Sequence, residues 1–426
     1  MERGLISVDR WAEGSQAYFL THLHADHTRG LTSAWSRGPL FCSRLSAKLL
    51  PSKFPGFDLS LLRVLDVGAW HSLSLLSPSS AADTLVRVMP LDAHHCPGAV
   101  MYLFSGHFGS LLYTGDFRWE TTSEKANRSR DMLVKALNGS RVNALYLDNT
   151  YCNPSYSFPS RRDAAQQVVD IIASHPKHHV IIGIDTLGKE DLLVHIARVL
   201  KIKIWVWPER LQTMHMLGFD EIFTTKTSLT RVRAVPRYSF TLDTLKGLNK
   251  MHPTIGIMPS GLPWALKPLD RNENFFDSLA RSYYNNKAHE VASMEERLHP
   301  EIYTVPYSDH SCFMELHEFV QLVQPINMRG IVSSSSCYID PSYYFGHCDG
   351  VYQTFQRVQH KGKESGKEHV RVVRAEASVE VNDLIDSTRK GRKCGTVGVS
   401  GVYMSRASAS RRRRRGAKIM EDISAD

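Results

Sequence analysis

The sequence predicts an α/β protein, and three observations favour this class. The first 150 residues contain several short apolar runs that end at polar turns, a pattern typical of strands. From about residue 155 onward, strand, turn and helix patterns alternate, which is typical of a parallel sheet covered by helices. Histidine and aspartate residues also gather directly after several of the expected strands.

The composition is that of a folded chain. Its 426 residues are enough for two or three domains, and 42% hydrophobic with 22% charged residues excludes a wholly disordered protein. No apolar run approaches the ~20 residues of a membrane span, so we expect no membrane partner. The charged start lacks the apolar stretch of a secretory signal. The seven cysteines contain no C-x-x-C pair, which argues against a disulfide framework and favours a reducing compartment.

The positive charge is concentrated near the end of the sequence. The formal net charge is +9, and residues 361–426 carry +7 of it. We expect residues 346–426 to form a basic, mostly disordered tail, because apolar periodicity is lost there. This tail contains a cluster made of Arg411–Arg415 and Lys418. Such clusters are typical of nuclear import signals, so the sequence predicts a nuclear protein, with a solvated charge run as the alternative.

In the first part of the chain the pattern predicts mainly strands. Helix signals are few there, and one is expected over Ser43–Leu50. The expected strands are Ala17–Thr21, Leu85–Met89, Ala99–Phe104, Leu111–Thr114 and Ala144–Leu147.

Beyond residue 155, apolar residues recur at helical spacing. Ser160 is a suitable N-cap for a helix that reaches His175, and His179–Ile184 is typical of a buried strand. The turn DTLGKE then leads into a helix over Asp191–Leu200. Further expected elements are the strands Ile202–Val206, Pro253–Pro259 and Ile326–Ser333, the helices Pro208–Leu217 and Cys312–Val323, and a polar surface excursion over Arg271–Glu301.

The strongest functional signal is the sequence THLHADHTRG, which directly follows an expected strand. Four residues that commonly bind metals lie within six positions: His22, His24, Asp26 and His27. This spacing allows His22 and His24 to bind one metal ion, and Asp26 and His27 to bind a second. Imidazole and carboxylate groups are suitable ligands for zinc and similar ions. A polar surface loop is the alternative, and four such residues at this spacing make it the minor one.

Further ligand-type residues follow other expected strands. LDAHHCPG offers His94 and His95, YTGDFR offers Asp116, and PYSDHSC offers Asp309 and His310. Asp116 is suited to bridging two metals, because a carboxylate has two oxygens. Each residue alone has a simpler interpretation as a loop residue or a helix cap. Together they supply the ligands that a two-metal site needs.

These motifs resemble the metallo-β-lactamase superfamily, and more closely its β-CASP nucleases. Within these, the chain is similar to the Apollo/Artemis group of DNA repair and crosslink repair nucleases over roughly residues 5–340. The matching segments are HLHADH, LDAHHCPGAVMYLF, LLYTGDFR, LYLDNTYCNP, IGIDTLGKE, HPTIGIMP and PYSDHS. The resemblance implies an αββα sandwich built from residues 1–153 and 298–345. A β-CASP α/β domain is expected at residues 154–297, with the active site between the two parts.

The resemblance also implies roles for individual residues. The first metal would be held by His22, His24 and His95. The second would be held by Asp26, His27 and His310, with Asp116 as a bridge, and Asp26, Asp116 and His310 are the expected catalytic residues. Asp9 and Asp148 would hydrogen-bond the ligands and orient them. His95 matches the family ligand rather than His94, because relatives read DANHCPG there.

One position departs from the family pattern. The segment TRVRAVP has Arg233 where several relatives have a histidine, so no role is carried over to it. An arginine there has two interpretations, a phosphate contact or a surface charge. For phosphate binding we expect Thr186 and Lys189 at the start of a helix, and Ser333 after the last strand. A plain turn and a solvated loop are the respective alternatives.

The implied function is a metal-dependent DNA nuclease that hydrolyses phosphodiesters with two metals. We expect a 5′-to-3′ exonuclease in DNA repair, either at interstrand crosslinks or double-strand breaks, or in telomere end processing. Its substrate would be single-stranded DNA or DNA with a 5′-phosphate end. Its cofactors would be one or two divalent ions, with Zn²⁺ favoured by the histidines and Mg²⁺ or Mn²⁺ as options for the second site.

Four alternatives stay open at this point. An Artemis-like structure-specific endonuclease and an RNA-processing β-CASP nuclease share the same motifs. A small-molecule hydrolase is disfavoured, because such chains lack a second α/β domain before the last ligand. An inactive binding scaffold is disfavoured too, because none of the expected ligands is missing.

Overall fold

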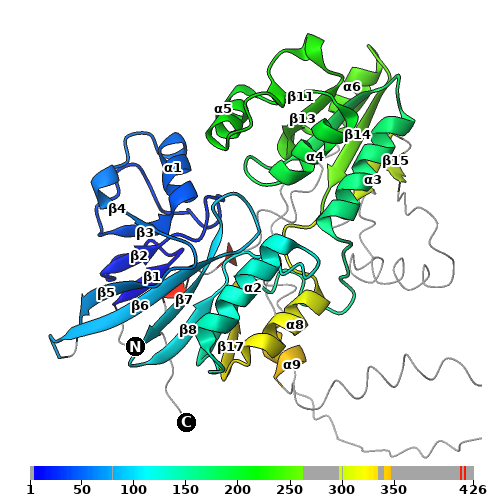
Figure 1. Cartoon of the computed structure of the whole chain (residues 1–426). Coiled ribbons are helices and arrows are strands. Elements are labelled where there is room, and N and C mark those ends of the chain that lie inside the picture. Colours follow the sequence, from blue (N-terminus) through cyan, green and yellow to red (C-terminus); the bar gives the residue numbers. More distant parts are fainter. Residues whose placement is uncertain are drawn as a thin grey trace, which may run out of the picture. The chain divides into compact units, whose positions relative to one another are not determined.

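The structure is a computed structural model that describes residues 4–78, 80–261, 297–299, 301–333, 340–346, 413–414 and 417–418 (Figure 1). The chain divides into two units, Met1–Gly346 with Arg406–Asp426, and His347–Ser405. All described residues belong to the first unit. Among them, no helix is both long and apolar enough to span a bilayer.

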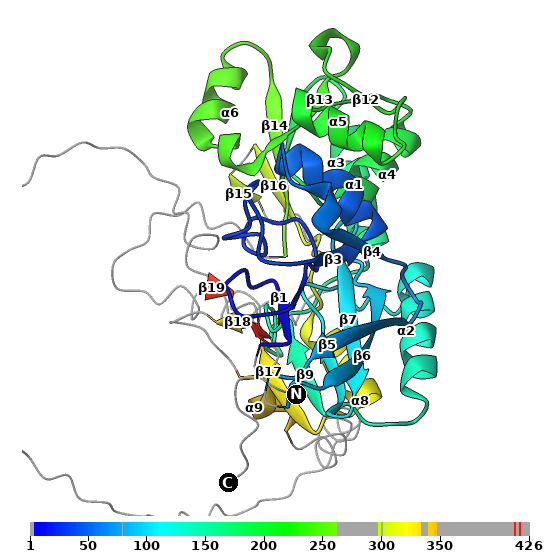
Figure 2. The same cartoon turned by 90° about the vertical axis from the view of Figure 1, so that its left-hand side faces the viewer.

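The first sheet is short and mainly parallel. Its order is β20-β1-β2-β3-β4, and only β20 runs antiparallel to its neighbour. Helix α1 (Arg44–Lys53) begins at the N-cap Ser43 and lies beside β3 and β4 (Figure 2). Its Leu49 and Leu50 are buried in one cluster with Leu40 and Cys42 of β3. The strands are β1 (Ile6–Val8), β2 (Ala17–Phe19), β3 (Leu40–Ser43), β4 (Leu62–Leu65) and β20 (Ala417–Lys418).

The second sheet has the order β17-β9-β8-β7-β6-β5. Its strands are β5 (His71–Leu76), β6 (Asp83–Asp92), β7 (Val100–Gly106), β8 (Gly109–Tyr113), β9 (Ala144–Leu147) and β17 (Asn327–Gly330). Aromatic residues join it to the first sheet, since the Phe19 ring lies 5.2 Å from that of Tyr102 and 5.0 Å from that of Phe104. Large apolar side chains from both sheets therefore share one core.

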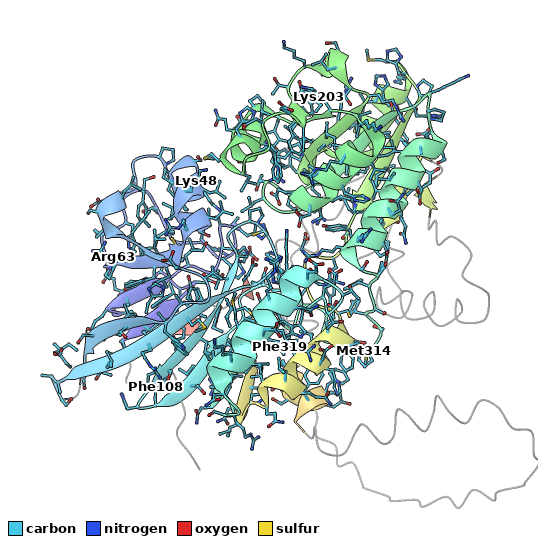
Figure 3. The ribbon with its side chains drawn as sticks, in the orientation of Figure 1. Lys48, Arg63, Phe108, Lys203, Met314 and Phe319 are labelled. Atoms are coloured by element: carbon cyan, nitrogen blue, oxygen red, sulfur yellow. The ribbon has the colours of Figure 1, made fainter. Side chains whose placement is uncertain are left out.

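Two helices lie on the outer face of the second sheet, α2 (Glu124–Leu137) and α8 (Phe313–Val323) (Figure 1). Phe319 of α8, labelled in Figure 3, packs against the rings of Phe117 and Trp119 at 4.8 Å each. With α1 on the other side, the layers are helix, sheet, sheet and helix. This confirms the predicted α/β class and its αββα sandwich.

Helix α2 has no counterpart among the expected elements. Its buried residues are Ala126, Ser129, Leu133 and Leu137. Their spacing is helical, but two of the four are small or polar, so the apolar periodicity is weak in the sequence.

The third sheet belongs to the inserted segment, with the order β12-β11-β13-β10-β14-β16-β15. All its pairs are parallel except β15–β16. This agrees with the strand and helix alternation of the sequence. Its elements are α3 (Arg161–Ser174), β10 (His179–Ile184), α4 (Glu190–Leu200), β11 (Ile204–Trp205), α5 (Pro208–Met216), β12 (Phe223–Thr224), β13 (Val232–Pro236), α6 (Leu242–Asn249), β14 (Thr254–Pro259), β15 (Arg297–His299) and β16 (Ile302–Val305).

The end of the inserted segment differs from the expected boundary at residue 298. Strand β16 pairs with β14, so Ile302–Val305 completes the third sheet rather than the sandwich. The chain returns to the sandwich only after this strand, through Tyr307–Cys312 and into α8. The residues IYTV of β16 are typical of a strand, but the neighbour with which that strand pairs depends on the fold.

The remaining elements are short. The 3₁₀ helices are Leu59–Leu61, Thr227–Leu229 and Arg237–Ser239, and α9 spans Pro341–Phe345. β18 (Val332–Ser333) pairs with β19 (Arg413–Arg414), and β20 pairs with β1. Of the expected surface excursion over Arg271–Glu301, only β15 and Glu301 are among the described residues. Of the expected basic tail over residues 346–426, only residue 346, β19 and β20 are described.

Candidate metal centre

The site forms where chain segments leave several strands on one side of the sandwich. His22 follows β2, His95 follows β6, Asp116 follows β8, and Asp148 follows β9. His310 lies on the segment between β16 and α8. Side chains at strand ends are held by a rigid sheet yet stay free of the strand pairing, which suits a site that must bind a ligand.

The carboxylate of Asp116 lies between four histidines. Its Oδ2 is 3.8 Å from His22 Nε2 and 3.5 Å from His95 Nε2. The same oxygen is 3.9 Å from His310 Nε2, while Oδ1 is 3.2 Å from His27 Nε2. Ligand atoms around a tetrahedral zinc ion, with bonds near 2 Å, lie about 3.3 Å apart. These spacings therefore fit divalent metal ions on both oxygens of Asp116.

His24 completes the group around the first set of histidines. Its Nδ1 lies 3.0 Å from Nε2 of His95. Ligand atoms of His22, His24, His95 and Cys96 lie within 4.8 Å of one another, so this group could hold a metal. Burial raises the pKa of the Cys96 thiol well above its ordinary value, which disfavours the thiolate form that binds metals.

A hydrogen bond orients the other nitrogen of each histidine. Nδ1 of His27 lies 2.7 Å from Asp9, and Nδ1 of His310 lies 2.7 Å from Asp148. The remaining three are Nδ1 of His22 with Thr21 Oγ1 at 3.0 Å, Nδ1 of His95 with the Asp309 carbonyl at 2.8 Å, and Nε2 of His24 with the Leu187 carbonyl at 2.9 Å. Each partner leaves the opposite ring nitrogen directed at the cluster.

Asp9 and Asp148 each accept hydrogen bonds from more than one group. Besides His27, Asp9 accepts hydrogen bonds from the amide of Thr21 at 2.9 Å and from its hydroxyl at 2.6 Å. Burial opposes ionisation of Asp148, but the charge of His310 and hydrogen bonds from His310 and Thr150 hold its pKa below the ordinary value. Both carboxylates can thus act as fixed acceptors beneath the histidines.

The charge state of His24 suits metal binding. Burial lowers its pKa to about 4, against the opposing effect of the hydrogen bond to Leu187. The ring is therefore neutral near pH 7, and its Nδ1 lone pair is available to a cation.

One side of the cluster is open to solvent. The side chain of Asp26 is 42% exposed and that of His310 is 17% exposed. The side chains of His22, His27 and Asp116 are all at most 2% exposed. Asp26 and His310 therefore lie on the more exposed side of the cluster, and His24 is half-buried as well.

Comparison with known proteins places this site in a family. The sequence model of the family "DNA repair metallo-beta-lactamase" matches residues 219–336. The 5′ exonuclease Apollo of Gallus gallus is 40% identical over 337 residues, which cover 78% of this chain and 63% of that protein. Apollo of Danio rerio is 37% identical over 334 residues, covering 77% of this chain and 51% of that protein. The DNA cross-link repair protein SNM1 of Arabidopsis thaliana is 32% identical over 326 residues, covering 74% and 60%.

The chain is similar to the DNA repair metallo-β-lactamase family over residues 219–336, and to the named relatives over about three quarters of its length. The resemblance drawn from its motifs is thereby confirmed. The matched parts span about half to two thirds of the length of these relatives. The matching family implies divalent metal ions, and the histidine and aspartate groups described above could bind them.

His94 has a different environment from the neighbouring His95. Its Nε2 lies 3.0 Å from the hydroxyl of Ser129 on α2, and its carbonyl accepts a hydrogen bond from Arg161 at 2.6 Å. Its backbone has φ +53°, which turns the chain between the two histidines. His94 therefore contacts α2, whereas Nε2 of His95 faces Asp116 Oδ2.

The expected phosphate-binding residues have other contacts. The Lys189 ammonium lies 2.8 Å from Asp309 and 3.4 Å from Asp185, and its side chain is buried. Thr186 is exposed, and its carbonyl accepts a hydrogen bond from Arg210. Ser333 ends β18, and Arg233 lies in β13 opposite Ile181 of β10. The phosphate roles remain predictions.

Several residues that shape the site gave no signal in the sequence. Thr21 connects Asp9 to His22, and Arg210 donates to the carbonyls of Thr186 and Gly188. Arg118 is buried and donates to the carbonyl of Ser308 at 3.0 Å and to Glu315 at 3.0 Å. The sequence does not show whether an arginine is buried or exposed, so the buried positions of Arg118 and Arg210 became apparent only in the fold. For Thr21, its place beside His22 was the available hint.

Proposed function

We propose that this chain is a metal-dependent DNA nuclease that digests DNA from the 5′ end during repair. The observation that carries the proposal is the Asp116 carboxylate, which lies within 4 Å of nitrogens from four histidines. Relatives named as 5′ exonucleases and cross-link repair proteins support the choice of DNA and of the 5′ end.

Seven residues would hold the ions. His22, His24 and His95 would bind the first, and Asp116 would contribute to both. The second would be bound by Asp26, His27 and His310. Bound divalent ions would supply Lewis acidity toward phosphate oxygens and would lower the pKa of a water molecule. The many imidazole ligands favour Zn²⁺ over Mg²⁺ or Mn²⁺.

The chain's own residues hold this arrangement in place. Asp9 and Asp148 fix His27 and His310 through short hydrogen bonds, so both rings need little reorganisation on binding. The hydroxyl of Ser308 donates to the His310 carbonyl at 2.8 Å, and that of Ser311 donates to the Phe117 carbonyl at 3.1 Å. Both serines therefore shape the loop around His310, and hydrolysis needs no serine nucleophile.

The exposed side of the cluster sets the direction of substrate approach. Because Asp26 and His310 are the accessible ligands, the scissile phosphate would enter from their side. The ligands opposite are buried, which keeps bulk water from that face of the site.

The proposal is tested with matched oligonucleotides that differ only in their ends. Single-stranded DNA with a 5′-phosphate should be shortened from that end, more slowly with a 5′-hydroxyl, and not at all in EDTA. Cutting at a hairpin tip would favour a structure-specific endonuclease, and faster digestion of the matched RNA would favour an RNA-processing enzyme. No cleavage of any nucleic acid with zinc restored would contradict a nuclease.

We also propose that the protein acts in the nucleus, as the basic cluster predicts. Arg413–Arg414 and Ala417–Lys418 pair with strands of the first unit, so part of the cluster has a second structural use. Deletion of residues 405–426 from a fluorescent fusion should reduce nuclear accumulation. Unchanged accumulation would assign import to another segment.

A further inference from the structure

The segment between β10 and α4, residues 185–190, lies against two of the histidines described above. The carbonyl of Leu187 accepts a hydrogen bond from Nε2 of His24 at 2.9 Å. At Gly188, φ is +103°, and an added Cβ would lie 4.0 Å from His24 Nε2 and 3.8 Å from Asp309 Oδ2. This turn of the inserted segment therefore contacts the metal centre through its backbone.

Arg210 of α5 holds the turn from behind. Its guanidinium is fully buried and donates to the carbonyls on both sides of Leu187, those of Thr186 and Gly188. It also pairs with Glu190 at 2.8 Å, and Glu190 accepts from the Gly188 amide at 2.9 Å. A planar guanidinium can bind two carbonyls in a fixed geometry, which the ammonium of a lysine cannot do.

Lys189 connects the same turn to a second histidine. Its ammonium pairs with the Asp309 carboxylate at 2.8 Å. The carbonyl of Asp309 accepts from Nδ1 of His95 at 2.8 Å. Nδ1 of His24 and Nε2 of His95, the two nitrogens left over, face each other at 3.0 Å.

We propose that residues 185–190, held by Arg210, are a positioning element that sets the metal affinity of His24 and His95. The proposal rests on the metal centre of the proposed function. The Leu187 carbonyl keeps the proton of His24 on Nε2, so that Nδ1 is the nitrogen that binds. Lys189 holds Asp309, whose carbonyl keeps the proton of His95 on Nδ1. Arg210 and Lys189 are thus positioning residues, which act through the Leu187 carbonyl and through Asp309.

The test compares Arg210 with Arg231, because both arginines donate hydrogen bonds to backbone carbonyls of the inserted domain. Arg231 donates to the carbonyls of Ile172, His175 and His178, in the same domain but in contact with none of the proposed ligands. Zinc affinity of the full chain is measured by competition with a chromophoric chelator, and stability by urea unfolding of the metal-free protein. R210K should weaken zinc binding about 10- to 100-fold, whereas R231K should keep it within about twofold.

Equal zinc affinities of R210K and wild type, or equal losses in R210K and R231K, would overturn the proposal. If R210K does not fold, Lys189→Met decides, since it removes the ammonium contacts with Asp309 and Asp185 but leaves Arg210 in place, and it should also weaken zinc binding. A wild-type chain that binds zinc no better than Asp116→Asn would instead contradict the metal centre itself.

The nuclease assay gives a second readout on Lys189. As a positioning residue, Lys189→Met should reduce digestion of 5′-phosphate and 5′-hydroxyl strands by the same factor. If Lys189 instead bound the phosphate, Lys189→Met would slow digestion of the 5′-phosphate strand more than digestion of the 5′-hydroxyl strand. A selective loss with unchanged zinc affinity would overturn the positioning role of Lys189.

Discussion

Asp148 Oδ2 lies 2.7 Å from Nδ1 of His310, although the two residues are 162 positions apart. Asp148 leaves β9 in the second sheet, and His310 arrives after β16 of the third sheet. The whole inserted domain lies between them in the chain. The site is therefore completed only when that domain has folded and returned the chain to the sandwich.

Asp148→Asn tests the charge of this contact without removing its acceptor oxygen. The amide oxygen can still accept a hydrogen bond from Nδ1 of His310. A neutral amide attracts the N–H group of the imidazole less strongly than a charged carboxylate does. We expect a 10- to 100-fold loss in metal affinity or turnover, with the fold retained. Asp131→Asn, at an exposed position of α2, is the control. An Asp148→Asn protein equal to this control would show that the charge has no role.

Asp116→Asn removes the shared carboxylate charge from the cluster. Because both Asp116 oxygens face histidine nitrogens, we expect fewer zinc ions per chain and turnover lower by about 100-fold or more. Metal content is measured by elemental analysis after dialysis, and turnover on a 5′-phosphate strand. Full metal content with near-normal turnover would refute the bridging role.

Gly115→Ala tests how closely the Asp116 loop approaches the HLHADH turn. An added Cβ would lie 2.9 Å from Cβ and Cγ2 of Thr21, which hydrogen-bonds Asp9. Gly139→Ala is the matched control, because Gly139 also has a positive φ but no atom within 4 Å of its Cβ position. The control should lose about 1–2 kcal/mol from the strained φ alone.

Gly115→Ala should lose about 1–3 kcal/mol more than this control in urea unfolding, because the new methyl displaces Thr21. It should also bind zinc less well, whereas Gly139→Ala should not. The same loss of stability in both variants would mean that the loop adjusts to the methyl group.

The low pKa of His24 predicts a pH dependence of the metal-free protein. Burial lowers this pKa from 6.5 to about 4. The unfolded chain therefore takes up the proton first as the pH falls, so the stability that neutral His24 contributes above pH 6.5 is lost between 6.5 and about 4. The unfolding free energies of wild type and His24→Gln, measured in EDTA, should approach each other over this range. If the difference in unfolding free energy between the two proteins stayed constant from pH 6.5 to about 4, the lowered pKa of His24 would be contradicted.

The sequence alone was sufficient for the local features of this protein. Strand and helix periodicity predicted β10 and α3, because each pattern repeats within a few residues of its own element. The spacing of His22, His24, Asp26 and His27 predicted metal binding, because these ligands share one turn. Helix α2 was not predicted, because its buried face includes Ala126 and Ser129 and its apolar pattern is therefore weak.

Only the tertiary structure decided which distant groups meet. The pairing of β16 with β14, the contact of Leu187 with His24 and the link from Lys189 through Asp309 to His95 all join segments far apart in the chain. In the sequence, Lys189 beside a glycine at the start of a helix indicates a phosphate contact. In the fold, its ammonium forms ion pairs with Asp185 and Asp309. Long-range partners depend on how sheets and helices pack, and that packing is a property of the whole chain rather than of any one segment.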